Sequence, residues 1–395
     1  MKRLSILFLF VFLSIDVFAQ TDSSQMNIDA NYSRPFLIKD NTPVALGGYI
    51  EANTQYEGTD GIPEGFAFQF RRLTLFASST ISENLKFLTE IEFEDGTKEI
   101  NIEYAALDIM FNSLLNLRGG IVMNPIGSFN QNHDGPKWDF IDRPIEPTAL
   151  LGATLSNVGF GLYGKYFVSD LVFSYETYLT NGYDDHVIAN DLNRTSLAAG
   201  KVNPEKFEES VSGLPMFSGK LAMKYRKIGE FGISYMNGVY NSWRIEGVEV
   251  DEKRSVSVLA FDLDVSLTST TYLRGEAAFV SVDVPDSYSQ QFGEKQYGGY
   301  IDIVQTVFQG EILSFKDAKL NLCVRGEYVD FNSGTFNETG GNISDDITSF
   351  TGALSLRLTG STVIKANYRY SIIQDLLGNP PAHNSALQFG LATYF

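Results

Sequence analysis

The sequence predicts an all-β protein, a transmembrane antiparallel β-barrel of about 16 strands with short turns at one end and long loops at the other. Three observations support this prediction. The last segment, 385–395, alternates apolar with small or polar side chains and ends on Phe395. Segments of the same period follow one another from residue 44 onward. The connections between them alternate in length. Since successive side chains of a strand point to opposite faces, a period of two indicates strands.

The strands are expected to cross a bilayer at a tilt, and each segment is long enough to do so. We expect them at 44–57, 66–80, 85–95, 100–111, 114–123, 157–168, 170–181, 217–228, 230–240, 254–267, 270–283, 297–309, 319–331, 349–359, 361–373 and 385–395.

The connections fall into two sets, which is the pattern of a barrel made of hairpins. The short set comprises 81–84, 112–113, 169, 229, 268–269 and 360. The long set comprises 58–65, 124–156, 182–216, 241–253, 284–296, 332–348 and 374–384. Connection 96–99 is a short member of the long set, and 310–318 is a long member of the short set.

The two faces of each strand differ in polarity. In 349–359, Phe350 and Leu354 lie on one face, whereas Thr351, Ser355 and Arg357 lie on the other. A cation facing lipid at mid-bilayer costs roughly 2–4 kcal/mol. The apolar face is therefore expected outside, and the polar face is expected to line water.

Continuing this phase along the chain gives a set of inward cations, which are the candidate pore-lining and anion-binding residues. They are Arg72, Arg118, Lys165, Lys220, Lys224, Arg226, Arg274, Arg325, Arg357, Lys365 and Arg369. Two explanations stay open. A basic strip in a low-dielectric wall concentrates anions. Alternatively the cations pair with acids to brace the wall, as Arg274 beside Glu276 or Arg325 beside Glu327.

The long connection 124–156 carries mixed charge and aromatic side chains, a composition typical of functional loops. We expect it to fold inward and narrow the lumen; the alternative is an ordinary external loop with turn residues. The candidate constriction residues are Asp134, Lys137, Asp139, Asp142 and Arg143.

The N-terminus has the pattern of a secretory signal. Lys2 and Arg3 precede an apolar run, and Val17-Phe18-Ala19 fits a cleavage site before Gln20. We expect a signal peptide at 1–19, a short periplasmic segment at 20–43 and the barrel at 44–395. Export and a barrel together predict the cell outer membrane.

Several functions are disfavoured. The net charge of −18 argues against nucleic acid as a partner. A lone Cys323 gives neither a disulfide framework nor a cysteine metal cluster. Asp134-Gly135 and Asp184-Asp185-His186 fit solvated turns better than calcium loops. The three histidines, His133, His186 and His383, are expected in loops without a serine partner, so we expect no enzyme, metal site or cofactor.

Three short motifs resemble the phosphate-selective porin O and P family. They are Phe70-Arg71-Arg72-Leu73-Thr74-Leu75 with Leu85-Lys86-Phe87, Leu117 to Pro125, and Phe140-Ile141-Asp142-Arg143-Pro144. The resemblance implies a sixteen-stranded, often trimeric, Gram-negative porin that uses inward Arg and Lys to pass phosphate. This chain departs from the pattern, because it is acidic and an early strand points Glu90, Glu92 and Glu94 inward.

The expected function is passive diffusion of small hydrophilic solutes, with anions such as phosphate as one candidate class. The alternative is a structural or adhesive barrel that acts through its external loops. The expected partners are membrane lipid and lipopolysaccharide, the solutes themselves and, from the resemblance, two further copies of the chain in a homotrimer.

Overall fold

The computed structural model describes residues 25–37, 44–96, 98–200 and 206–395. The expected signal peptide at 1–19 lies outside the described residues. Within them, no helix has the length and hydropathy needed to cross a membrane.

Sixteen strands form one closed antiparallel barrel, as predicted. Its first half consists of β1 (Ala45–Thr59), β2 (Ile62–Ser82), β3 (Leu85–Glu94), β4 (Glu99–Met110), β5 (Asn116–Met123), β6 (Ser156–Val168), β7 (Leu171–Thr180) and β8 (Met216–Tyr225). Its second half consists of β9 (Gly229–Val239), β12 (Ser255–Ser266), β13 (Thr271–Val282), β14 (Lys295–Ile312), β15 (Phe315–Asp330), β16 (Asp346–Arg357), β17 (Thr362–Gln374) and β18 (Ala382–Tyr394).

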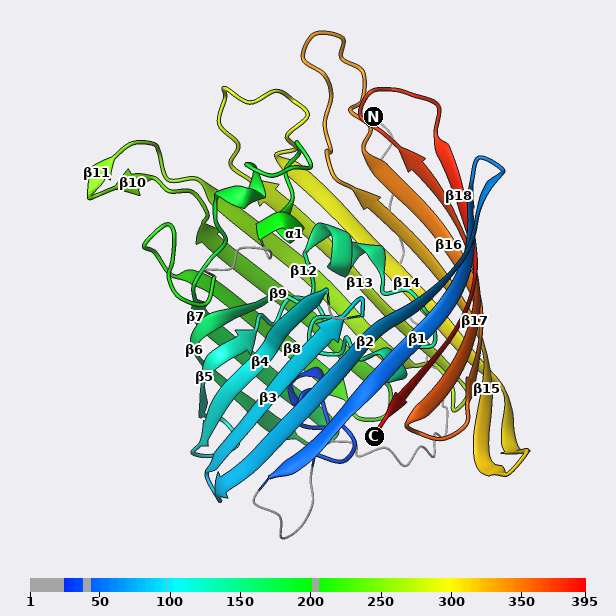
Figure 1. Ribbon diagram of the computed structural model, residues 1–395. Helices are drawn as coiled ribbons and strands as arrows, with labels where there is room; N and C mark the ends of the chain where they lie inside the picture. Colours follow the sequence, from blue (N-terminus) through cyan, green and yellow to red (C-terminus); the bar gives the residue numbers. More distant parts are fainter. Residues whose placement is uncertain (1–24, 38–43, 97, 201–205) are drawn as a thin grey trace, which may run out of the picture.

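The barrel closes where β18 pairs with β1, with Tyr394 opposite Tyr49 and Asn384 opposite Thr59. Every other barrel strand pairs with its sequence neighbours, and the strands tilt around the axis (Figure 1). The closing strand thus has the role that its alternating pattern predicts. Closure gives every strand two partners, so the barrel has no open edge.

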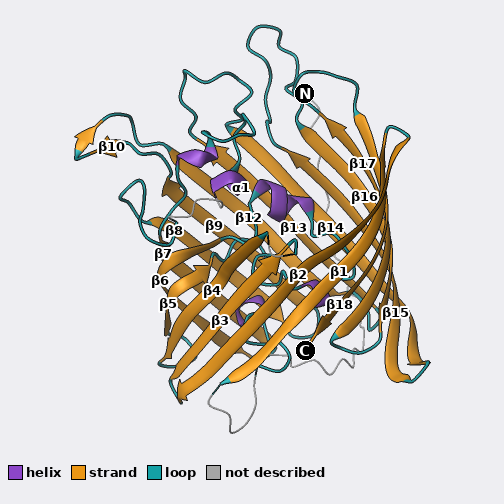
Figure 2. Cartoon of the chain, viewed as in Figure 1, coloured by secondary structure: helices purple, strands orange, loops and turns teal. Residues whose placement is uncertain are grey.

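The barrel has two unlike ends, which we call the turn end and the loop end. The turn end carries the short hairpins; the loop end carries the longer connections (Figure 2). Short elements lie in the segments outside the barrel strands: η1 (Asn27–Asp29), η2 (Gly135–Lys137), η3 (Glu146–Leu150), η4 (Asp185–Val187), α1 (Leu197–Gly200) and the hairpin β10 (Arg244–Ile245) with β11 (Val248–Glu249).

Two expected connections are wrong, because their strands continue further than the hydrophobic pattern suggests. The expected loop 58–65 is a turn of two residues, Asp60-Gly61, with positive φ at both positions. Asp-Gly favours this turn because it tolerates positive φ and matches the strand twist. The expected connection 310–318 shrinks to Leu313 and Ser314 between β14 and β15.

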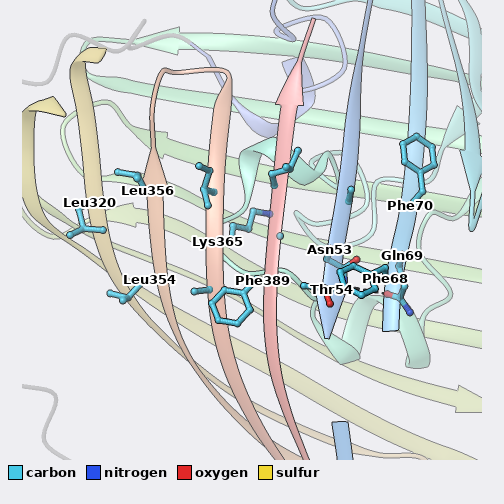
Figure 3. Close-up of a pocket in the computed structure, with 15 residues that line it drawn as sticks. Asn53, Thr54, Phe68, Gln69, Phe70, Leu320, Leu354, Leu356, Lys365 and Phe389 are labelled. Carbon is cyan, nitrogen blue, oxygen red and sulfur yellow. Dashed lines mark hydrogen bonds between the residues drawn. The ribbon is translucent and has the colours of Figure 1, made fainter. Parts of the chain in front are cut away.

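The outer wall is apolar and carries a hollow of about 650 Å³ between β1, β2 and β15–β18. Figure 3 shows Phe68, Leu354 and Phe389 around it. The small side chains of Ala52 and Ala366 leave the space that the larger neighbours surround. This hollow lies on the outer wall and does not belong to the lumen.

The inner wall is less polar than expected on one side of the barrel. Its polar positions were expected to line water, yet toward the loop end of β8, β9, β12 and β13 the inward side chains are apolar and buried, for example Val258 and Val280. Leu150 and Leu155 of the connection 124–155 and Leu197 of α1 pack against them. This side of the barrel therefore contains a hydrophobic core rather than water.

Candidate functional site

The connection 124–155, here called the lumen loop, lies inside the barrel and bonds to strands on every side of it. Its backbone and side chains hydrogen-bond with inward residues of β2, β3, β7, β8, β9, β13, β15, β16, β17 and β18. A loop held at so many points spans the cross-section of the lumen.

One anchor of the lumen loop is Asp139. Its carboxylate accepts hydrogen bonds from Ser355 Oγ at 2.7 Å and from Arg357 Nε at 3.0 Å, and Asn321 and Tyr272 also donate to it. Burial favours the neutral acid, but the Arg357 guanidinium and these hydrogen bonds outweigh it and hold the pKa of Asp139 below its usual value. Asp139 therefore docks as a carboxylate.

A second anchor is Asp142, which faces the loop end. Arg71 Nη2 lies 2.6 Å from its Oδ1, and Arg369 and Gln388 contact its other oxygen. The side chains of Arg71, Arg369 and Asp142 are about one-fifth exposed, unlike the fully buried groups deeper in the lumen, whereas Gln388 is buried.

The sequence pattern does not assign Arg71 to the inner face, because Arg72 beside it already points inward. A β-bulge resolves the conflict: Glu51 pairs with Arg72 and Ala52 pairs with Phe70, so Arg71 is the extra residue. The signal was present in the sequence. The outward-facing residues Phe66, Phe68 and Phe70 are two positions apart, but the next outward-facing residue, Leu73, follows after three positions, which indicates one extra residue.

The predicted cations do face the lumen, and most of them contact a carboxylate. Arg325 makes a bidentate pair with Asp302 at 2.6 and 2.7 Å. Arg118 makes one with Asp108 at 2.7 and 3.0 Å. The other pairs are Arg72 with Glu51 and Glu94, Lys165 with Asp29, Lys220 with Asp262, Arg274 with Asp264, Arg357 with Asp139, Lys365 with Glu51, and Arg369 with Glu57 and Asp142.

The expected bracing partners on the same strand, Glu276 and Glu327, are not the ones used. Arg274 stands directly opposite Asp264, and Arg325 directly opposite Asp302, on the neighbouring strands. Directly opposed residues are closer than residues two apart on one strand, so the cross-strand acid binds the cation.

The last two predicted cations, Lys224 and Arg226, line a cavity of about 930 Å³ at the turn end. Lys224 donates to the backbone oxygen of Gln25. Lys137 and Trp138 of the lumen loop also line the cavity.

The remaining lumen-loop candidates lie near the acids of β3. Asp134 pairs with Lys137 at 3.4 Å. Arg143 lies 3.6 Å from Glu92 and 3.8 Å from Glu94. The early acidic strand is thus matched by cations that the loop and other segments bring to it.

Glu90, Glu92 and His133 bring one ligand atom each within 4.8 Å of one another, the only such group among the described residues. Arg34 bonds to Glu90 at 2.9 Å, and Arg143 lies beside Glu92. Side-chain cations therefore occupy the positions around these carboxylates.

The histidines lie apart from one another. His133 Nδ1 is 2.9 Å from the oxygen of Asn130, and His186 contacts Asp184. His383 was expected in a loop but belongs to β18, where it bonds to Tyr370. The reason is that β18 starts three residues earlier than its alternating pattern indicates.

The segment 20–43 was expected to be a periplasmic lead. Its described residues, 25–37, lie within the barrel against the inner wall, beside the lumen loop (Figure 1, dark blue). The sequence offered no periodic signal for this position.

Comparison with solved structures finds the same architecture in outer-membrane porins. The anion-selective porin from Comamonas acidovorans superposes with a TM-score of 0.57 at 11% identity, covering 89% of this chain and 99% of that one. The channel DcaP of Acinetobacter baumannii gives 0.55 at 11% identity, covering 91% and 99%. Salmonella typhi OmpF, solved with daunomycin, gives 0.55 at 11% identity, covering 89% and 98%. The chain has the barrel fold of outer-membrane porins.

Sequence comparison adds little about the family. No family model matches the chain, so the resemblance to the phosphate-selective porin family stays a prediction. An uncharacterized protein of Aquifex aeolicus (strain VF5) is 31% identical over 206 residues, which are 50% of this chain and 45% of that protein. The chain spans less than half the length of this relative.

Proposed function

We propose that the protein is an outer-membrane channel for passive diffusion of small hydrophilic solutes, with a narrow lumen. The observation that carries the proposal is the lumen loop, which is tied across a closed barrel by charged and polar contacts. An apolar outer wall suits lipid, and a charged interior suits water and solutes. The signal peptide and the homotrimer belong to the same proposal.

The proposed lumen is weakly selective rather than a strong anion filter. Arg325, Arg118 and Lys220 are each neutralised by a buried carboxylate. A paired cation has little net field with which to concentrate anions. Lys224 and Arg226 line the open cavity at the turn end and are the better candidates for contact with anions such as phosphate.

Liposome swelling tests the channel. Proteoliposomes containing the purified protein should swell in iso-osmotic solutions of small amino acids or pentoses and not in solutions of trisaccharides, because a narrow lumen excludes by size. Equal swelling with both sizes would contradict a narrow lumen, and no swelling with either would contradict the channel.

A second function, a structural or adhesive barrel that acts through its loops, is favoured by one observation. The lumen holds a hydrophobic cluster made by the lumen loop and α1, and this packing leaves less room for water. If no swelling is observed with any solute, the structural or adhesive function becomes the better account. Binding of whole cells to immobilised protein then tests that function.

A further inference from the structure

We propose that residues 25–37 form a tethered plug, and that the plug narrows the lumen by placing Arg34 in a guanidinium-binding site of the wall and the lumen loop. This inference rests on the proposed channel function. It adds a narrowing element and the chemical class of ligand, a guanidinium group, that the central site accepts.

The site around Arg34 has the features of a specific guanidinium site. Nε and Nη2 of Arg34 donate to the two oxygens of Asp134 at 2.9 and 2.8 Å, which is a bidentate pair. Nη2 also lies 2.9 Å from Glu90. The guanidinium carbon stands 4.1 Å from the centre of the Phe76 ring. Two carboxylates and an aromatic face surround one planar cation.

The surroundings fix these groups in place. Tyr394 donates to Asp134 at 2.6 Å, and His133 lies 3.2 Å from Glu90. Arg34, Glu90, His133 and Asp134 have no exposed side-chain surface. These charges can be buried because each of them is paired with an opposite charge. Removing Arg34 would leave two buried carboxylates without their guanidinium partner.

The rest of the plug binds the wall at both ends. Met26 and Ile28 are buried against Val172 of β7 and Ala222 of β8. Leu37 packs in a cluster with Tyr49 of β1. Apolar anchors on opposite sides of Arg34 hold the segment across the turn end of the lumen.

The plug also rests on the lumen loop. Lys137 of the loop reaches the oxygen of Ala30, and Asn27 accepts a contact from the loop while its backbone donates to Glu230 of β9 at 2.9 Å. Asp29 pairs with Lys165 of β6. These contacts thus connect the lumen loop, through residues 25–37, to β6 and β9.

The position of Arg34 explains why this segment would narrow the passage. Toward the loop end, Arg71 and Asp142 are one-fifth exposed. Toward the turn end, residues of the segment line two cavities, of about 930 and 480 Å³. Between these wet regions lies the fully buried cluster of Arg34, Glu90 and Asp134. Withdrawal of the segment would expose that cluster and widen the passage between the two regions.

Thiol labelling tests the position of the plug without requiring any current. Val172 is fully buried beneath Met26 and Ile28. In a Cys323→Ser background, Val172→Cys should resist a charged thiol reagent in the full chain and react after deletion of residues 25–37. Lys227→Cys, at an exposed turn position, is the positive control in both proteins.

Single-channel recording tests the narrowing. Deletion of 25–37 and Arg34→Ala should each raise conductance by at least ~2-fold, because both widen the narrowest region. Guanidinium chloride at millimolar concentration, on the order of the effective concentration of a tethered group, should lower the conductance of Arg34→Ala again, and the same concentration of NaCl should not. Arg244→Ala removes an exposed pair with Glu249 and is the matched control.

The outcomes separate the two proposals. Val172→Cys that reacts in the full chain, or stays unreactive after the deletion, overturns the plug. If neither Arg34→Ala nor the deletion changes the conductance, the plug proposal is overturned, whereas the channel function still stands. If no variant conducts current in bilayers but the labelling follows the prediction, the segment lies where it is proposed to lie and the channel function is wrong.

Discussion

Gly127 of the lumen loop lies directly against the carboxylate of Glu276 on β13. Glu276 accepts from the two backbone N–H groups that follow, Ser128 at 2.8 Å and Phe129 at 3.0 Å. A Cβ built on Gly127 would fall 1.7 Å from a Glu276 oxygen. Gly127 also has φ +66°, which a side chain rarely adopts. The loop thus enters the lumen at a position that only glycine fits.

Gly127→Ala is therefore expected to displace the start of the lumen loop. The strained φ costs about 1–2 kcal/mol, and the overlap with Glu276 adds to it. We expect a conductance change of at least ~1.5-fold in planar bilayers, because the loop sets the lumen width. Gly378→Ala is the matched control, since Gly378 has φ +73° and no atom near its Cβ position. Equal behaviour of the two variants would show that the contact with Glu276 does not position the loop.

Arg325→Met is expected to destabilise the barrel by about 3–5 kcal/mol, because it leaves Asp302 buried without its bidentate partner. Denaturant unfolding in detergent, followed by the mobility shift of folded barrels on gels, measures the change. The double variant Arg325→Met with Asp302→Leu should recover most of the loss. If the double variant is as unstable as the single one, lost packing rather than an unpaired charge is the cause.

Glu146 gives a pH prediction. Its carboxyl group is fully buried in the lumen loop; burial, then Glu276, Asp262 and Glu327, raise its pKa well above the usual value. A raised pKa means that the protonated acid stabilises the folded state. That contribution is complete below the ordinary pKa of about 4.3 and is lost as pH rises through the higher folded value.

Wild-type protein should accordingly lose stability as pH rises above about 4.3, and Glu146→Gln should lose less, since the amide cannot ionise. Glu338→Gln, in an exposed loop, should follow the wild type. The measurement is the denaturant midpoint as a function of pH, from about 4.3 upward. A pH dependence identical in the wild type and Glu146→Gln would show that Glu146 does not carry it.

Arg71 and Arg369 give a selectivity prediction. Both contact Asp142 and both are partly exposed near the loop end. Replacing both with Gln removes two positive charges and leaves two carboxylates, Asp142 and Glu57, without their arginine partners, so the reversal potential across a KCl gradient should shift toward cation preference. Arg244→Gln, outside the barrel, should leave the potential unchanged. A shift toward anions in the double variant would contradict the placement of these charges in the passage.

The architecture was predictable because barrel strands repeat one simple rule. Alternation places Lys220, Arg325 and Lys365 on the inner face, and the structure agrees. The rule fails where pairing departs from regularity. The bulge at Arg71 adds a residue, and the tight turn at Asp60-Gly61 lets β1 and β2 continue where the sequence becomes polar. Both departures leave local signals that a strict period of two overlooks.

The interior was harder to predict, because its contacts join residues far apart in sequence. Inward apolar residues such as Val258 look like interruptions of a polar face until Leu150 and Leu197 are known to cover them. Arg34 lies in a polar stretch with no period, and only the fold brings Asp134 and Glu90 to it. Alternation reports which face a side chain takes, but it cannot report which segment packs against that face.

The most direct test of the central claim is single-channel recording of the purified full-length protein in a planar bilayer, with the 25–37 deletion recorded beside it. The account predicts discrete current steps from the wild type and steps at least ~2-fold larger from the deletion variant, because both the lumen loop and the plug narrow one continuous passage. Absence of current from both proteins, with folded barrels confirmed on gels, would contradict the claim that this barrel is a channel.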